Sequence, residues 1–400
     1  MASRYGCPVP IPPEPSESAD RSIDGGSAWF AGVRARRVVE CVDLAAQSER
    51  VASGGFWAVV GDFEGPVRAW RFAEVTRDPG PGDQIAHPAD AQPASGTWRG
   101  PASSSWSTSL DRPTYLRAVE AVREEVRAGR VYQANICRVL TAPLAASRGA
   151  DGTRGAEPDA AALGRVLAAG NPAPYAGGVH IPAATGLPPV WVVTASPELY
   201  LRLDGDMVTS APIKGTGITA TDLQGKDRAE NVMITDLVRN DLQRVCAPGT
   251  VEVTSLLRVE QHPGLVHLVS TVQGRLSPEI ARAPDRWARI LDATFPPGSV
   301  SGAPKSSALR VIAALETAPR GPYCGVVGWI DADAGRAELA VGIRTFWWRA
   351  DAAAGSRTTQ GGTLSFGTGA GITWGSDPAA EWAETELKAD RLIALASMSG

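Results

Sequence analysis

The sequence predicts an α+β fold in which antiparallel β-sheets carry helices on their outer faces. Many short runs rich in β-branched and aromatic residues are separated by short turns, which is typical of antiparallel sheets. Fewer stretches repeat their apolar residues at helical spacing. With 400 residues and 44% hydrophobic content, the chain can bury the core of one large domain or of two to three ordinary ones.

The composition divides the chain into three parts. Residues 1–27 are polar and rich in proline, and we expect them to form a disordered arm. Residues 28–112 form an N-terminal portion with strand-like runs such as 56–60. Within it, a stretch from Asp78 to Pro113 is dense in Pro, Gly, Ser and Asp and is typical of a loop or linker. We expect the main folded region in residues 113–396.

Three segments predict helices. The apolar residues of 115–126 recur at helical spacing, and Gly129 follows where a C-cap glycine belongs. A second helix is predicted for 229–246, closed by the Pro-Gly pair at 248–249. The third opens with Asp377 as its N-cap and a proline at the first helical position.

Alternating residue types predict the strands. In 131–140 the alternation places Gln133 on one face with Asn135 and Cys137. The other predicted strands span 190–195, 199–203, 266–273, 325–330, 337–349 and 363–367.

Charge and composition exclude several partners. The formal net charge is −4 and there is no basic tract, which argues against nucleic acid and anionic membranes. No apolar run approaches the roughly 20 residues that span a bilayer, and the N-terminus lacks the order of a signal peptide. Five cysteines without a C-x-x-C pair indicate reduced thiols and a cytoplasmic protein: Cys7, Cys41, Cys137, Cys246 and Cys324. The four histidines lack metal-ligand spacing, so any metal would be a hard cation on carboxylates.

One lysine stands out in a turn-like segment, Pro212–Thr216, within a region poor in basic residues. An amine held between Ile213 and Gly215, and partly shielded from water, can act as a nucleophile. The alternative is that Lys214 is a solvated loop residue.

The last predicted helix places Glu381, Glu384 and Lys388 at i, i+3 and i+7, on one face. They form either a solvent face with a Glu384–Lys388 ion pair or one side of a cleft. Glu230, which opens another predicted helix, favours the cleft. Two helices that each present a carboxylate to one cleft can build an oxygen-only Mg²⁺ site.

Six short blocks occur in a fixed order: Pro212–Thr216, Asp227–Asn231, Pro297–Lys305, Gly342–Thr345, Gly369–Ile372 and Glu381–Glu384. In this order they resemble the chorismate-utilising enzymes, and most closely component I of aminodeoxychorismate synthase. The resemblance extends over residues 111–395. It implies two stacked antiparallel sheets flanked by helices, with the active site in a cleft between the sheets and residues 113–396 as the chorismate-binding catalytic region.

The resemblance implies a Mg²⁺ site. Glu230 and Glu384 would be direct ligands, and Glu381 would act nearby through water. Chorismate carries two carboxylates, so without a cation its binding beside three glutamates would be strongly disfavoured.

The resemblance also implies which residues move protons. Glu198 would be the general acid that protonates the departing C4 hydroxyl. His267 would lie near that hydroxyl, and Thr216 would hydrogen-bond it or fix the turn. The plainer alternatives are a surface carboxylate for Glu198 and a core histidine for His267.

The resemblance implies three further groups of residues that contact the substrate. Arg344 would clamp the enolpyruvyl carboxylate, although an edge-strand arginine in solvent is the alternative. Gly215 and a turn formed by Gly369, Ala370 and Gly371 would bring backbone close to the substrate. Lys388 would meet the ring carboxylate unless it stays paired within its helix.

Two positions choose among the reactions of the family. Members that add water carry a lysine base where this chain has Gln133, which cannot act as a base. Ammonia users carry glutamine there. Among these, anthranilate synthases usually have alanine where this chain has Lys214, and lysine is typical of aminodeoxychorismate synthases, which make 4-amino-4-deoxychorismate for p-aminobenzoate and folate.

Other functions stay open at this point. Anthranilate synthase component I is the first alternative, and a non-catalytic chorismate- or tryptophan-binding subunit is another. Pro174–Tyr175 resembles the family segment beside a tryptophan pocket, but an ordinary turn explains it equally well. No cysteine has the G-x-C-x-G setting that glutamine hydrolysis needs, so we expect ammonia from a separate glutamine amidotransferase subunit.

Overall fold

The computed structural model describes residues 25–77, 97–145, 157–217, 219, 221, 223, 225–262, 265–351 and 361–398. Most of the predicted arm and the first half of the predicted linker lie outside these ranges, so the disorder predicted for them stays a prediction.

Antiparallel strands dominate the described part of the chain. They are β1 (Ser27–Phe30), β2 (Val33–Asp43), β3 (Phe56–Gly61), β4 (Val67–Arg77), β5 (Ser107–Thr108), β6 (Gln133–Ala145), β7 (Tyr175–Ile181), β8 (Val190–Ser196), β9 (Leu199–Asp204), β10 (Met207–Ala211), β11 (Ile213–Gly217), β12 (Glu252–His262), β13 (Leu265–Arg275), β14 (Gly302–Ala303), β15 (Val326–Asp331), β16 (Arg336–Val341), β17 (Thr345–Ala350) and β18 (Gly361–Ile372). Shared neighbours join them into one 18-stranded sheet.

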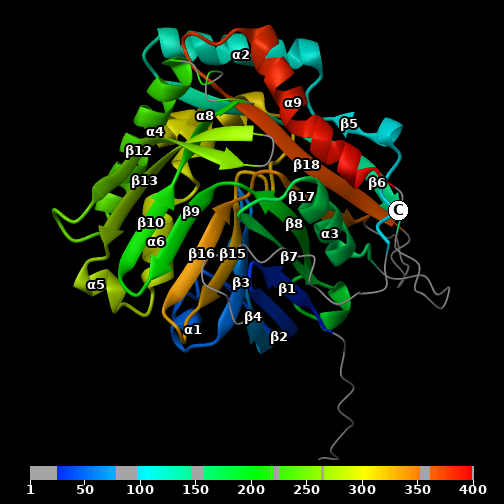
Figure 1. Cartoon of the computed structure of the whole chain (residues 1–400), viewed down its shortest axis with the longest axis vertical. Helices are drawn as coiled ribbons and strands as arrows, with labels where there is room; N and C mark the ends of the chain where they lie inside the picture. Colours follow the sequence, from blue (N-terminus) through cyan, green and yellow to red (C-terminus); the bar gives the residue numbers. More distant parts are fainter. Residues whose placement is uncertain are drawn as a thin grey trace, which may run out of the picture.

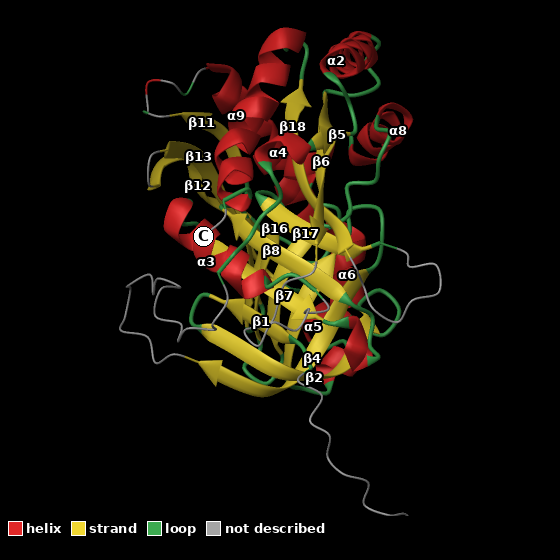
Figure 2. Cartoon of the chain, turned by 90° about the vertical axis from the view of Figure 1, so that its right-hand side faces the viewer, coloured by secondary structure: helices red, strands yellow, loops and turns green. Residues whose placement is uncertain are grey.

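Helices cover the sheet, and α2 and α9 pack side by side at one end of the molecule (Figures 1 and 2). The helices are α1 (Glu49–Ala52), α2 (Arg112–Arg127), α3 (Ala160–Gly170), α4 (Gly225–Gln243), α5 (Pro278–Ala281), α6 (Arg286–Thr294), α7 (Gly298–Ser301), α8 (Lys305–Leu315) and α9 (Pro378–Ala396). Short 3₁₀ turns span Ser103–Ser105 and Ala183–Thr185.

The sheet folds back on itself. Its pairings run from β12 and β13 through β10, β9, β16 and β15 to β3 and β4, and then through β2, β1, β7 and β8 to β17, β18 and β6. Strands β15 and β7 are in contact without being paired in a ladder. The predicted α+β class with stacked antiparallel layers is therefore confirmed.

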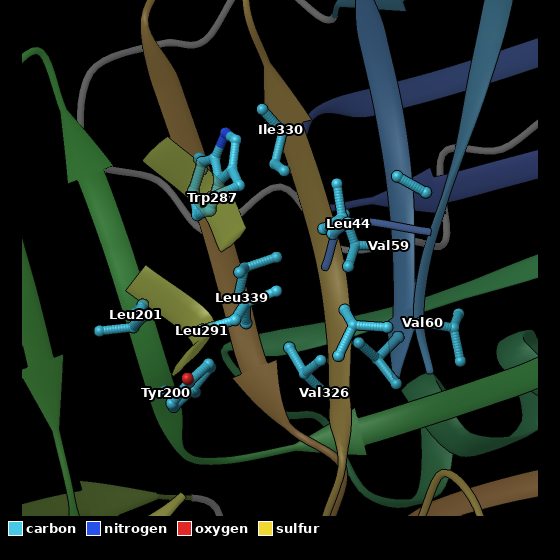
Figure 3. Close-up of a cluster of buried hydrophobic side chains, with 14 of the residues drawn as sticks. Leu44, Val59, Val60, Tyr200, Leu201, Trp287, Leu291, Val326, Ile330 and Leu339 are labelled. Atoms are coloured by element: carbon cyan, nitrogen blue, oxygen red, sulfur yellow. The ribbon is translucent and has the colours of Figure 1, made fainter. Parts of the chain in front are cut away.

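The main core fixes the strand that follows Glu198. Trp287 and Leu291 of α6 belong to one buried cluster with Tyr200 and Leu201 of β9, and all four are labelled in Figure 3. The same cluster takes in Val59 and Val60 of β3, Val326 and Ile330 of β15, and Leu339 of β16. Each such side chain contributes about 1.5–3 kcal/mol of burial free energy, so the start of β9 is firmly held.

Most of the predicted helices and strands are confirmed, with two corrections. The helix predicted for 229–246 begins at Gly225, so Glu230 lies in its second turn. The single strand predicted for 337–349 is wrong, because the chain leaves the sheet at 342–344 between β16 and β17. A strand-like composition on both sides concealed this break.

Aromatic side chains hold α9, the helix that carries three candidate residues. The indole of Trp98, near the middle of the predicted linker, donates a hydrogen bond to the Ala396 carbonyl at the end of this helix at 2.8 Å. Trp382 packs edge-on against Tyr115 of α2, with ring centroids 5.6 Å apart. The Arg138 guanidinium lies 4.2 Å from the centre of the Trp382 ring.

Among the described residues, the four cysteines are free thiols, and all but Cys41 are buried. The helices that the structure describes include none with the length and apolar character needed to cross a bilayer.

Candidate active site

Glu198 lies in the short connection between β8 and β9 and is only 3% exposed. Its carboxylate accepts hydrogen bonds from the Ser299 hydroxyl and the Ile213 backbone N–H. Burial raises the pKa of Glu198 to about 7, against the opposing effects of these hydrogen bonds and of the charges of Lys214 and Lys388. The carboxyl is therefore close to half-protonated at neutral pH, which suits a general acid.

Lys214 lies on strand β11, not in a turn as its sequence predicted. It is opposite Leu268 of β13, and the register shifts between Lys214 and Thr216. Gly215 stands at this bulge with φ 77°, a left-handed conformation that favours glycine. A Cβ at Gly215 would lie 2.8 Å from Cβ of Asp227, so α4 approaches the bulge closely.

The amine of Lys214 influences acids on two helices. Burial raises the pKa of Glu230 on α4, and the charge of Lys214 opposes that rise. Burial also acts to raise the pKa of Glu384 on α9, but Lys388 and then Lys226 and Lys214 bring it below its ordinary value. The structure thus brings Lys214 together with the carboxylates predicted to share its site.

The acids expected to hold Mg²⁺ meet between α4 and α9, and Lys226 lies among them. Its ammonium is 2.7 Å from Oε1 of Glu381 and 3.7 Å from Oε1 of Glu230. Glu384 pairs instead with Lys388 at 2.5 Å. Within the described ranges, no group of three acidic, histidine or cysteine side chains is close enough to hold a metal ion.

The donor set nevertheless fits a cation that prefers oxygen. Oε1 of Glu230 and Oε2 of Glu381 are buried and have no hydrogen-bond partner among the described residues. A buried polar atom without a partner is costly, and a bound ion would relieve that cost. Mg²⁺ takes such oxygens together with waters, so these carboxylates could hold it if they closed around it in place of Lys226.

Lys388 forms the intrahelical ion pair that the sequence left as an alternative. Besides its contact with Glu384, it donates a hydrogen bond to the Gly369 carbonyl at 3.1 Å. Burial acts to lower the pKa of Lys388, but the charge of Glu384 raises it above its ordinary value. A substrate anion at Lys388 would have to share it with Glu384.

Arg344 lies in the break between β16 and β17, not in a strand as predicted. Its φ is 51°, and its carbonyl accepts the Ala195 N–H at 3.0 Å. Burial lowers the pKa of its guanidinium, and no carboxylate of the described residues pairs with it. A half-buried guanidinium without a counter-ion is a suitable receptor for a substrate carboxylate.

Gly369, Ala370 and Gly371 lie inside strand β18, paired with β6, so the predicted turn is wrong. Ala370 packs in the core. A Cβ at Gly369 would lie 2.5 Å from Sγ of Cys137, and one at Gly371 would lie 2.1 Å from Nε2 of Gln133. The glycines are therefore needed because side chains of β6 cross this face of β18.

Gln133 is fully buried, and its Oε1 has no partner among the described residues, whereas its Nε2 lies 3.5 Å from Asn135. His267 is buried in β13, where it is opposite Thr216 in the ladder. The side chain of Thr216 lies outside the described residues, so its predicted role stays a prediction.

Two residues of the site were not predicted. Ser299 reaches Glu198 from α7, and only the block of small residues at 297–305 pointed to that segment. Lys226 had a clearer signal, because the chain contains only four lysines: Lys214, Lys226, Lys305 and Lys388. Three of the four influence the carboxylates described above.

The sequence of residues 74–394 matches the family model of a chorismate binding enzyme. Anthranilate synthase component 1 of Streptomyces coelicolor is 37% identical over 72% of this chain and 52% of its own length. The corresponding protein of Halobacterium salinarum is 39% identical over 71% of this chain and 50% of its own length. Aminodeoxychorismate synthase of Streptomyces pristinaespiralis is 35% identical over 70% of this chain and 36% of its own length.

Two solved structures share the fold. Anthranilate synthase component I of Streptococcus pneumoniae superposes with a TM-score of 0.67 at 22% identity, covering 98% of this chain and 95% of that one. The menaquinone-specific isochorismate synthase of Escherichia coli superposes with a TM-score of 0.68 at 16% identity, and the match covers 94% of this chain and 88% of that one. The chain spans about half the length of the curated relatives it matches. Because the family model covers most of the chain and every residue of the site described above, this chain belongs to the chorismate binding enzyme family.

Proposed function

We propose that this chain is component I of an aminodeoxychorismate synthase, a Mg²⁺-dependent cytoplasmic enzyme that converts chorismate and ammonia to 4-amino-4-deoxychorismate for p-aminobenzoate and folate. The observation that carries the proposal is the placement of Lys214 near the buried acid Glu198, whose pKa its charge affects. An amine and a proton donor in one site suit a nucleophilic attack coupled to departure of a hydroxyl.

In the proposed reaction, the Lys214 amine attacks C2 of chorismate and the ring double bonds shift so that the C4–O bond breaks. Glu198 donates its proton to the departing hydroxyl, which leaves as water. Ammonia then bonds to C4, the double bonds shift back and the bond between C2 and Lys214 breaks. The ammonium formed at C4 returns one proton to Glu198, so the amine and the acid are both regenerated, and the net change replaces a hydroxyl with an amino group.

The other charged residues would hold the substrate. Arg344, which has no counter-ion of its own among the described residues, would take the enolpyruvyl carboxylate. Lys388 would turn from Glu384 toward the ring carboxylate. Bound Mg²⁺ would neutralise the ring carboxylate, with Glu230 and Glu384 as its ligands and Glu381 acting through water.

Anthranilate synthase component I is the second candidate, because two of the relatives described above carry that name. Lys214 favours the first candidate, since by resemblance anthranilate synthases have alanine at this position. A binding subunit without activity would need neither Lys214 nor an acid with a raised pKa.

A product assay separates the three candidates. The purified protein is incubated with chorismate, MgCl₂ and ammonium chloride, and products are followed by chromatography with and without added aminodeoxychorismate lyase. We expect p-aminobenzoate only when the lyase is present. Anthranilate formed without lyase would establish the second candidate, and tight chorismate binding without turnover would favour the third.

Ammonia is scarce at neutral pH, so we propose that a separate glutamine amidotransferase supplies it. Among the described cysteines, Cys137, Cys246 and Cys324 are buried, and none lies in a nucleophile turn. The chain alone should therefore use ammonium salts but not glutamine. Turnover with glutamine and no added partner would contradict this.

A further inference from the structure

Lys226 occupies the place where the proposed function needs a metal ion. It lies in the first turn of α4, and its ammonium reaches across to Oε1 of Glu381 on α9 at 2.7 Å. Glu381 is only 3% exposed, and its second oxygen has no partner among the described residues. A carboxylate buried this deeply needs a positive counter-ion, and here a side chain provides it.

The contacts of Lys226 differ from those of the permanent ion pairs in this chain. Lys305 is bonded both to Asp241 at 2.7 Å and to the Thr294 carbonyl at 2.9 Å, and its side chain is 18% exposed. Lys226 is 40% exposed, and its second contact is a weak one of 3.4 Å to the Ser376 hydroxyl.

The geometry also leaves the site incompletely satisfied. The ammonium is 3.7 Å from Oε1 of Glu230, which is too far for a hydrogen bond, and that oxygen has no other partner in the described structure. The Lys226 ammonium therefore forms a hydrogen bond with the Glu381 carboxylate but leaves Oε1 of Glu230 without one. A divalent ion with six ligand positions can take an oxygen of Glu230 directly and hold Glu381 through a bound water.

We propose that Lys226 is an internal stand-in for the metal ion: its ammonium neutralises Glu381 and Glu230 while the site is empty, and swings to solvent when Mg²⁺ binds. The inference rests on the proposed function, because it takes these carboxylates as the Mg²⁺ site. Lys226 is thus a positioning residue that keeps the acids of α4 and α9 together. An ammonium and Mg²⁺ cannot share this space, because their charges repel at such short range.

The test is a titration of the metal-free protein with MgCl₂ by calorimetry, without substrate. In Lys226→Met the competitor is absent, so the Mg²⁺ dissociation constant should fall about tenfold, a moderate value because Lys226 is partly exposed. The metal-free variant should also melt at a lower temperature than the metal-free wild type, and Mg²⁺ should raise its melting temperature by more.

Lys226→Arg provides a second variant with the opposite expectation. A guanidinium can bind Glu381 with two parallel hydrogen bonds and is harder to displace, so the dissociation constant should rise. Arg239→Met is the matched control, because Arg239 is an exposed cation of the same helix whose one ion pair among the described residues is with Asp236, at 2.6 Å. It should leave the Mg²⁺ titration unchanged.

The outcomes separate this inference from the proposed function. If the wild type binds Mg²⁺ and neither Lys226 variant changes the dissociation constant, the stand-in role is wrong and the metal site stands. Weaker binding by a folded Lys226→Met protein would overturn it too. If no variant binds Mg²⁺ at all, the metal site fails together with the inference, while the product assay still decides the reaction.

Discussion

Replacing Glu198 with glutamine should stabilise the protein at neutral and alkaline pH while it slows amination strongly. The pKa of this carboxyl is about 7 in the folded chain, against 4.5 as its ordinary value, and the first cause is burial. The difference of about 2.5 corresponds to about 3 kcal/mol, at 1.36 kcal/mol for each unit. The carboxyl is 3% exposed, so solvent screening reduces this figure little.

The sign of the effect follows from proton linkage. The Glu198 carboxyl holds its proton more tightly in the folded chain than in the unfolded chain. Its contribution to the free energy of unfolding is therefore fully present below about pH 4.5. As pH rises from 4.5 to 7, the unfolded chain releases this proton first, and about 3 kcal/mol of stability is lost. Glutamine has nearly the same shape and never ionises, so the variant avoids this loss.

The measurement is the unfolding free energy in urea, for wild type and Glu198→Gln, at pH 5 and pH 8 without metal or substrate. The advantage of the variant should grow by about 2 kcal/mol between the two pH values, and amination should slow at least about 100-fold. Glu120→Gln, an exposed acid of α2, is the control and should run parallel to wild type. Parallel curves for Glu198→Gln would refute the reasoning.

Three further predictions concern neighbouring residues. Ser299→Ala removes a hydrogen bond that lowers the pKa of Glu198, so the alkaline limb of the kcat/KM profile should move up by about one pH unit. An unchanged alkaline limb would show that Ser299 does not influence the pKa of Glu198. Lys214→Ala should slow amination at least about 100-fold with little change in chorismate affinity, and a wild-type rate would exclude the covalent route. Glu230→Gln should raise the Mg²⁺ concentration for half-maximal activity at least about tenfold, whereas an unchanged titration would remove it from the metal site.

Local patterns predicted the elements that an unbroken spacing of apolar residues marks. The helix at 115–126 and the strand at 131–140 were found because their apolar spacing continues through each element. The break at Arg344 could not be found in this way. Its left-handed backbone is fixed by distant contacts, such as the Ala195 N–H on the Arg344 carbonyl, and a sequence window contains no sign of them.

The segment at Gly369–Gly371 shows how a long pairing overrides a local preference. A G-x-G sequence favours a turn, but β18 pairs with β6 along its whole length. The glycines instead leave room for Gln133 and Cys137, which cross from β6. The candidate site was predicted better than its backbone, because its acids and Lys214 were assigned through the family pattern rather than through local propensity.

By our proposals, Lys226 and Lys388 must release their carboxylate partners when Mg²⁺ or substrate binds, and lysine suits this exchange better than arginine. The chain has 39 basic residues, of which four are lysines. One of its permanent pairs uses arginine: Arg320 is fully buried, bonds both oxygens of Glu316 and also bonds two backbone carbonyls. Such a fork is rigid and costly to release. A partly exposed lysine such as Lys226 holds its partner as a single mobile charge, which can be given up when a substrate or metal arrives.

Lys388 allows a test of whether a releasable lysine pair is needed that does not depend on the metal site. It is held by Glu384 at 2.5 Å, and by our proposal it must turn to the ring carboxylate of chorismate. Lys388→Arg keeps the charge but can bind Glu384 through two hydrogen bonds. The KM for chorismate should therefore rise at least about fivefold, the effect of roughly 1 kcal/mol, with a smaller change in kcat. If Lys388→Arg binds chorismate as wild type does, release of this pair is not part of substrate binding.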